Sequence, residues 1–115
     1  QPIEWARIYD NKRFNASSWP LSKNVHAVAG IGNPAKFYKT LSNLGLNPIQ
    51  HSFPDHYQFS EEDLDFGDSL PIIMTEKDAV RCLDMNSKNL WYLSVEAQFE
   101  NKDLAEKILN KLTIQ

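Results

Sequence analysis

One short segment constrains the fold of this sequence more than any other: an apolar run, then a glycine-rich turn and a helix start. The run is Val25–Ala29, the turn is Gly30-Ile31-Gly32, and Asn33-Pro34 follows. Compact apolar runs are typical of parallel strands that are buried on both faces. Asn33 is a residue type that caps helices, and Pro34 suits the first helical position, where an N–H group needs no partner. The segment therefore predicts a strand–turn–helix unit.

Strand and helix signals alternate along the rest of the chain. Further strands are expected over residues 46–53, 70–74 and 90–95, and helices over 34–44, 61–66, 75–82 and from 101 onward. A strand–turn–strand signal over residues 3–14 precedes them. We therefore predict an α/β fold, with an open, mostly parallel sheet of about four strands, helices on both faces and an N-terminal β-hairpin.

Composition narrows the class of protein. The 115 residues are 42% hydrophobic, which is enough for one domain with its own core. A single cysteine, Cys82, excludes an internal disulfide, and no apolar run approaches the ~20 residues that a membrane-spanning helix needs. The net charge of −3 argues against bulk nucleic-acid binding, so nucleic acid is not expected as a partner.

The start of the chain and its charge distribution lead to two further expectations. The sequence opens at Gln1, and methionine occurs only at Met74 and Met85, so we expect a piece excised from a longer protein. Residues 1–39 are mainly basic, whereas the remainder is mainly acidic. The basic end could face phosphates, an anionic bilayer or only solvent.

Three polar loops follow the predicted strands. They are Gly30–Pro34, Pro54–Tyr57 and Thr75–Asp78. Ligands of parallel α/β sheets bind beyond the carboxyl ends of the strands, and these ends meet at one edge. We therefore expect the three loops to converge and to form the functional site.

The first loop has two weak motif matches. Gly30, Gly32 and Ala35 match the spacing of a dinucleotide-binding turn, but a strand-to-helix turn needs glycine for steric reasons alone. Pro34 also removes one of the N–H donors that a pyrophosphate would use. The same stretch fails as a P-loop, because Phe37 stands where a serine or threonine would bind magnesium.

The other two loops carry titratable side chains. His56 beside Asp55 could act as a general base or orient another acid, could join His51 in a metal site, or could be an exposed histidine beside a turn-capping carboxylate. In the third loop, Thr75 and Asp78 have the spacing of a capping box. Lys77 is not needed for capping and could reach a phosphate. We assign no metal ligands.

Four ordered segments carry a family resemblance. They read VHAVAGIGNP at 25–34, HSFPDHY at 51–57, LPIIMTEKDAV at 70–80 and LWYL at 90–93. Together they resemble the tetraacyldisaccharide 4'-kinase family, with similarity from about residue 25 to residue 95 and looser similarity at both ends.

The resemblance implies an ATP-dependent kinase of lipid A biosynthesis. Its family phosphorylates the 4'-hydroxyl of a tetraacylated disaccharide 1-phosphate at the cytoplasmic face of the bacterial inner membrane. It implies two α/β domains, of which an N-terminal P-loop domain binds most of the ATP and Mg²⁺. Residues 1–24 would then be an interdomain linker or hairpin, and residues 25–115 the C-terminal domain. The implied partners are the N-terminal P-loop domain, the lipid A precursor and the inner-membrane surface.

The resemblance also assigns residues. His56 matches a family histidine that pairs with a catalytic aspartate of the other domain, and Asp55 would orient it. Cofactor-binding positions implied along the interdomain cleft are Thr75, Glu76, Lys77, Asp78, Gly30 and Asn33.

Because the P-loop is missing from this sequence, we expect the isolated chain to be inactive. Two alternatives stay open: a free-standing nucleotide- or dinucleotide-binding module, and a noncatalytic domain that docks through Trp5 and Trp19.

Overall fold

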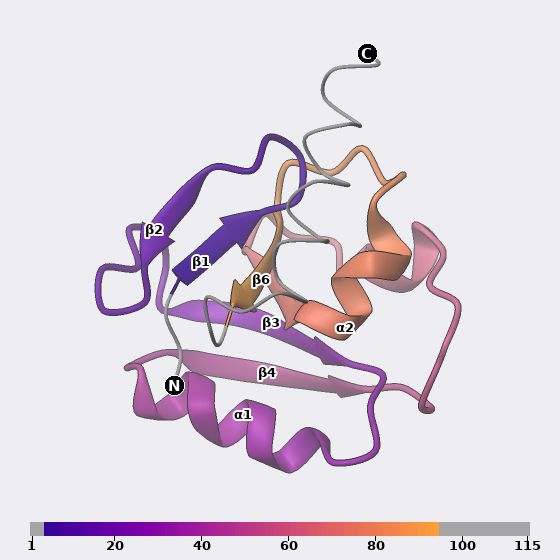
Figure 1. Cartoon of the computed structure of the whole chain (residues 1–115), viewed down its shortest axis with the longest axis horizontal. Helices are drawn as coiled ribbons and strands as arrows, with labels where there is room; N and C mark the ends of the chain where they lie inside the picture. Colours follow the sequence, from indigo (N-terminus) through magenta and orange to yellow (C-terminus); the bar gives the residue numbers. More distant parts are fainter. Residues whose placement is uncertain (1–3, 95–115) are drawn as a thin grey trace.

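Within residues 4–94, six strands form one mixed sheet (Figure 1). The structure is a computed structural model, which describes residues 4–94. The strands lie in the order β2-β1-β6-β5-β3-β4. The pairs β4–β3, β3–β5 and β5–β6 are parallel, whereas β1 is antiparallel to both β2 and β6. The strand bounds are β1 (Glu4–Arg7), β2 (Arg13–Asn15), β3 (Asn24–Ala29), β4 (Asn47–Ser52), β5 (Ile72–Thr75) and β6 (Leu90–Ser94).

The sheet confirms part of the sequence prediction and corrects another part. The four parallel strands β3, β4, β5 and β6 lie close to their expected positions. The N-terminal hairpin forms as well, but it extends the same sheet, which therefore has six strands and mixed direction. Trp5 of β1 is fully buried and pairs with Leu93 of β6. Hairpin signals are local in sequence, whereas this long-range docking is not, so the sequence alone did not reveal it.

Helices cover both faces, as expected (Figure 1). Helix α1 (Pro34–Asn43) packs Phe37, Tyr38 and Leu41 against one face, and the positive φ of Gly45 (+91°) allows the chain to turn away after it. The other face is covered by the short elements η1 (Glu62–Leu64), α2 (Glu76–Ala79) and η2 (Val80–Cys82). Both η elements are 3₁₀ turns. The helix expected over 61–66 is therefore shorter than predicted, whereas the helix expected over 75–82 forms as α2 and continues as the tighter η2 through Cys82.

The order of connections places a topological switch point between β3 and β5. From β3 the chain passes through α1 to β4 on one side, and from β5 it passes through α2 to β6 on the other side. The two connecting helices therefore diverge to opposite faces, and the carboxyl ends of β3 and β5 flank the gap between them. Sites in open α/β sheets form at such points.

Two further sequence expectations concern a C-terminal helix and a membrane-spanning helix. The helix expected from residue 101 lies outside residues 4–94. Within that described range, no helix has the length and apolar character needed to cross a bilayer.

Leu41→Ala tests the packing of α1. Leu41 is fully buried against the sheet, so this change should lower the free energy of unfolding by about 2–5 kcal/mol in urea titrations. Lys39→Ala changes an exposed residue of the same helix and should stay within about 0.5 kcal/mol of the unchanged chain. Equal effects of the two changes would contradict the packing described here.

Candidate functional site

The three predicted loops converge at the carboxyl ends of β3, β4 and β5. The backbone N–H of Gly30 donates to Asp78 Oδ2 over 2.9 Å, which joins the first loop to the third. The backbone N–H of His56 donates to the carbonyl oxygen of Gly30 over 3.2 Å, which joins the second loop to the first. Gly30 is thus the shared contact of all three loops.

Asp78 is the buried centre of this contact. Its side chain is fully buried, and Oδ2 also accepts a hydrogen bond from the Thr75 hydroxyl over 2.8 Å. The N–H of Asp78 donates to the same hydroxyl over 3.2 Å, so Thr75 caps α2 as predicted. The carboxylate does not complete the expected capping box, because it bonds the Gly30 amide rather than the Thr75 amide. Its contribution is therefore tertiary as well as local.

Close packing explains why position 30 is glycine. A Cβ atom there would lie 3.2 Å from Asp78 Oδ1, 3.2 Å from the carbonyl oxygen of Pro54 and 3.3 Å from the ring of Phe59. Those separations are tighter than ordinary van der Waals contact. Steric need, not phosphate binding, accounts for this glycine, and its N–H is already occupied by Asp78.

His56 stands at the tip of a β-turn. The N–H of Tyr57 donates to the carbonyl oxygen of Pro54, and His56 has a φ of +63° at the third position of that turn. Histidine adopts positive φ more readily than most residues, although the conformation is still strained. The turn leaves the imidazole 79% exposed at the rim of the sheet.

A side chain that sequence analysis did not identify holds the imidazole. Arg81 Nη2 lies 2.8 Å from His56 Nδ1, and Arg81 Nη1 lies 3.4 Å from Asp78 Oδ1. Asp55 Oδ2, which the resemblance assigned to this task, lies 3.8 Å from His56 Nε2, beyond hydrogen-bond distance. The nearby position of Asp55 is as expected, but the direct side-chain contact of His56 is with Arg81.

A pocket of about 570 Å³ opens beside this rim, on the α1 side of the switch point. Among the predicted site residues it is lined by Asn33, Thr75, Glu76 and Lys77, and Lys36 adds a second amine. Gly30 and Asp78 are not among the lining residues, and neither are Asp55 and His56. The predicted cofactor-binding set therefore divides into a pocket wall and a buried support behind it.

Asn33 occupies the N-cap position of α1, but its side chain makes no capping hydrogen bond. The expectation that Asn33 caps the helix is therefore wrong for its side chain. Its position in the pocket wall is instead set by the tight turn from β3 into Pro34.

The single cysteine plays no part at the rim. Cys82 is fully buried, and burial raises the pKa of its thiol to about 12. A thiol with such a pKa is not a nucleophile near neutral pH, and Cys82 instead packs within the hydrophobic core.

A second polar cluster lies across β3 and β4. The buried His26 of β3 contacts Asp68 through Nε2 (2.9 Å) and His51 of β4 through Nδ1 (2.9 Å). Phe66 stacks on both imidazoles, at centroid distances of 4.2 and 4.1 Å. The hydrogen bond with His26 lowers the pKa of Asp68, so the carboxylate accepts and His26 Nε2 donates. Burial lowers the pKa of His51, and His26 lowers it further, against the opposing effect of Asp68.

His51 is therefore committed to His26 rather than to the loop at 54–57. Among residues 4–94 there is no group of three histidine, cysteine or acidic side chains that could hold a metal ion. Within that range, His51, Asp55 and His56 therefore do not come together as one such group.

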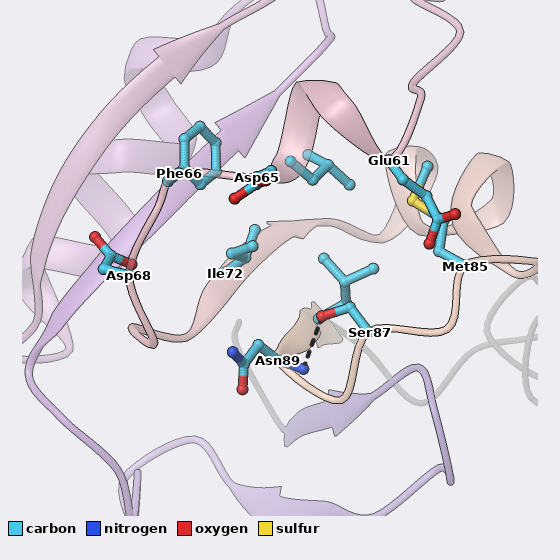
Figure 2. A pocket seen from close by; sticks show the side chains of 10 residues that line it. Glu61, Asp65, Phe66, Asp68, Ile72, Met85, Ser87 and Asn89 are labelled. Atoms are coloured by element: carbon cyan, nitrogen blue, oxygen red, sulfur yellow. Dashed lines mark hydrogen bonds between the residues drawn. The ribbon is translucent and has the colours of Figure 1, made fainter.

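A smaller pocket of about 220 Å³ lies at the amino ends of β5 and β6 (Figure 2). Figure 2 shows the carboxylates of Asp65 and Asp68 on one wall and Ser87 with Asn89 on another. The pocket is at the opposite end of the strands from the converging loops. The sequence analysis assigned no functional role to the residues that line it.

Comparison with known proteins identifies the family. The sequence profile of the tetraacyldisaccharide-1-P 4'-kinases matches residues 3–113. The chain belongs to the tetraacyldisaccharide 4'-kinase family. A relative from Hahella chejuensis, named tetraacyldisaccharide 4'-kinase, is 53% identical over 101 residues, which are 88% of this chain and 30% of that protein. A relative of the same name from Pseudomonas putida is 45% identical over 98 residues, or 85% of this chain and 29% of that protein.

A solved structure of a tetraacyldisaccharide 4'-kinase family member has a similar fold. LpxK from Aquifex aeolicus, crystallised as an "apo" form in complex with ATP, superimposes with a TM-score of 0.58 and 25% identity. The similarity covers 94% of this chain and 35% of that one. The chain thus spans about a third or less of the length of the kinase-family proteins that it matches.

Membership of the 4'-kinase family bears on the alternatives. It supports the kinase interpretation over a dinucleotide-binding module, and the structure agrees, because the Gly30 amide donates to Asp78 and not into the pocket.

Arg81 could have been suspected from its position three residues after Asp78 in a predicted helix, where the two side chains share one face.

Asp78→Ala tests the buried support of the site. It removes the acceptor for the Gly30 amide and should lower the free energy of unfolding by about 1.5–3 kcal/mol, while Asp78→Asn, which keeps an acceptor, should lower it less. Urea titration measures both. Asp84→Ala, at an exposed carboxylate, is the matched control. An equally large loss of unfolding free energy in that variant would contradict the stabilising role of the buried Asp78 carboxylate.

The cluster of His26, His51 and Asp68 predicts a pH dependence of stability. Because the pKa of His51 is lowered in the folded state, the unfolded chain binds more protons below pH 6.5, and stability should fall as the pH drops through that region. His51→Gln keeps a donor for His26 but cannot bind a proton. The free energy of unfolding of this variant should therefore fall less from about pH 7.5 to about pH 5.5, a window centred on the ordinary histidine pKa. Urea titrations across that window measure the difference, and parallel curves for the two proteins would show that His51 is not responsible.

Proposed function

We propose that this chain forms one wall of the active-site cleft of a tetraacyldisaccharide 4'-kinase. In this proposal, residues 25–115 are the C-terminal domain, residues 1–24 lead in from the other domain, and an N-terminal P-loop domain forms the opposite wall. The substrate would be the lipid A precursor, a tetraacyldisaccharide 1-phosphate, met at the cytoplasmic face of the inner membrane.

The observation that carries the proposal is the exposed position of the His56 side chain. A strained turn, tied to Gly30 through its backbone and to Arg81 through its side chain, holds an exposed imidazole at the carboxyl ends of the parallel strands. Strain of this kind persists where the surroundings enforce it and is frequent at functional sites. The exposed imidazole is available to a group of the opposite wall.

The pocket beside the rim suits an anionic cofactor. Lys36 and Lys77 both line it, together with the hydroxyl-bearing Thr75, and these groups could contact the phosphates of ATP. As the family resemblance implies, we propose that Mg²⁺ and most contacts with ATP belong to the P-loop domain. ATP supplies the transferred phosphoryl group when bound.

The residues of this chain would act by positioning and charge. Phosphoryl transfer depends on alignment of the reacting groups and on compensation of negative charge, which two walls of a closing cleft supply together. His56 would meet a carboxylate of the opposite wall that receives the proton of the attacking hydroxyl. Asp55 would add negative charge beside Nε2, and Asp78 would hold the loops in register.

Substitution of His56 tests the proposal in the full-length protein that carries this segment. His56→Ala should lower kcat by about 10²–10⁴-fold, the usual range for a group that assists proton transfer, with little change in thermal stability because the side chain is exposed. Gln58→Ala, at an exposed residue of the same loop, should leave kcat unchanged.

The competing functions give different results. Unchanged activity of His56→Ala would favour a noncatalytic interaction domain, and saturable binding of NAD to the 115-residue chain in thermal-shift titrations would favour a dinucleotide-binding module. Without the opposite wall, the 115-residue chain should transfer no phosphate from ATP.

A further inference from the structure

We infer that Arg81 is a positioning residue that fixes the proton of His56 on Nε2, so that the imidazole presents an N–H donor to the cleft. The inference deepens the proposed function: the position of the proton follows from contacts within this chain, whereas its use in phosphoryl transfer rests on that function. The chemistry that such a donor recognises is an anionic oxygen facing it.

The first step is the contact between the two side chains. Arg81 Nη2 lies 2.8 Å from His56 Nδ1. A guanidinium group carries donors only and stays charged at all relevant pH values, so Nδ1 must be the acceptor of this hydrogen bond. A neutral imidazole has one N–H group, and with Nδ1 accepting, that N–H is on Nε2.

The second step is the anchoring of Arg81. Its side chain is only 23% exposed, and Nη1 lies 3.4 Å from Oδ1 of the fully buried Asp78. Asp78 is itself held by the Gly30 amide and the Thr75 hydroxyl. A continuous series of polar contacts therefore runs from the ends of β3 and β5 through a carboxylate and a guanidinium to the imidazole.

The third step concerns the free side of the ring. Nε2 is the nitrogen nearer Asp55, at 3.8 Å from Oδ2, where a negative charge favours a proton on that nitrogen. The imidazole is 79% exposed, so its Nε2–H is available to a group outside this chain. A carboxylate or phosphate oxygen would accept this hydrogen bond, whereas a cationic or N–H group would not.

A mechanistic limit follows from this arrangement. An additional proton on His56 has to bind Nδ1, which requires Arg81 to move away. While Arg81 is in contact, His56 accepts no proton on Nε2, and it acts by orienting an acceptor and stabilising its negative charge. Arg81 would therefore be a positioning residue that acts through His56.

Nitrogen NMR of the 115-residue chain labelled with ¹⁵N-histidine tests the inference directly. In the unchanged chain, Nε2 of His56 should resonate as a protonated nitrogen and Nδ1 as an unprotonated one. Arg81→Met, which keeps the aliphatic stem, should shift both resonances toward the average of two exchanging forms. Arg81→Lys keeps a charged donor and should shift them less.

Arg13→Met is the matched control. Arg13 also bonds a carboxylate, Glu4, and an aromatic side chain, the Tyr92 hydroxyl, but it belongs to the hairpin. This change should leave the His56 resonances in place. A proton on Nδ1 in the unchanged chain, or identical His56 resonances with and without Arg81, would overturn the inference.

Kinetics of the full-length protein separate this inference from the proposed function. Arg81→Met should lower kcat by up to about 10²-fold, as misplacement of a catalytic group does, and Arg81→Met combined with His56→Ala should be no slower than His56→Ala alone. Multiplied losses in the double variant would overturn the positioning role. If His56→Ala itself were fully active while the NMR result held, the proposed function would fail and the assignment of the proton would stand.

Discussion

The buried carboxylate of Asp78 is the interaction on which the site end of this molecule depends. It accepts the Gly30 amide at the end of β3 and the Thr75 hydroxyl at the end of β5, the two strands that flank the switch point. A buried amide without an acceptor would lose the free energy of its hydrogen bonds to water, so the carboxylate stabilises the close approach of the two loops. The turn that carries His56 is attached to the same glycine through its carbonyl oxygen.

The sequence predicted those elements whose causes are local. The apolar run of β3, the start of α1 at Pro34 and the Thr75 cap of α2 each arise from residues within one turn or strand, and each lies where expected. The docking of β1 against β6 joins segments up to ninety residues apart, since Glu4 pairs with Ser94, and no local pattern specifies it. The helix signal at 75–82 likewise did not show that the last part of this segment, Val80–Cys82, is a 3₁₀ turn.

The site shows the same division between local and long-range causes. Convergence of the three loops followed from parallel topology alone, whereas the partner of His56 did not. Asp55 is its neighbour in sequence, but the contact at hydrogen-bond distance comes from Arg81, twenty-five residues later. The pairing of His26 with His51 and Asp68 likewise depends on strand register, since Val28 rather than His26 is the residue opposite His51 in the β3–β4 ladder. Two buried polar side chains, His26 of β3 and Asp78 of α2, form hydrogen bonds with groups distant in sequence.

The place of the hairpin in the sheet has a practical consequence for protein production. Removing residues 1–24 would take away the strand that pairs with β6 and would leave that strand as an open edge, with the apolar side chains of Trp91 and Leu93 newly uncovered beside it. Unprotected edges of this composition promote self-association through intermolecular strand pairing. An expression boundary at the start of β3 would therefore yield an aggregating product, and a shortened version suited to crystallisation or NMR has to retain β1 and β2.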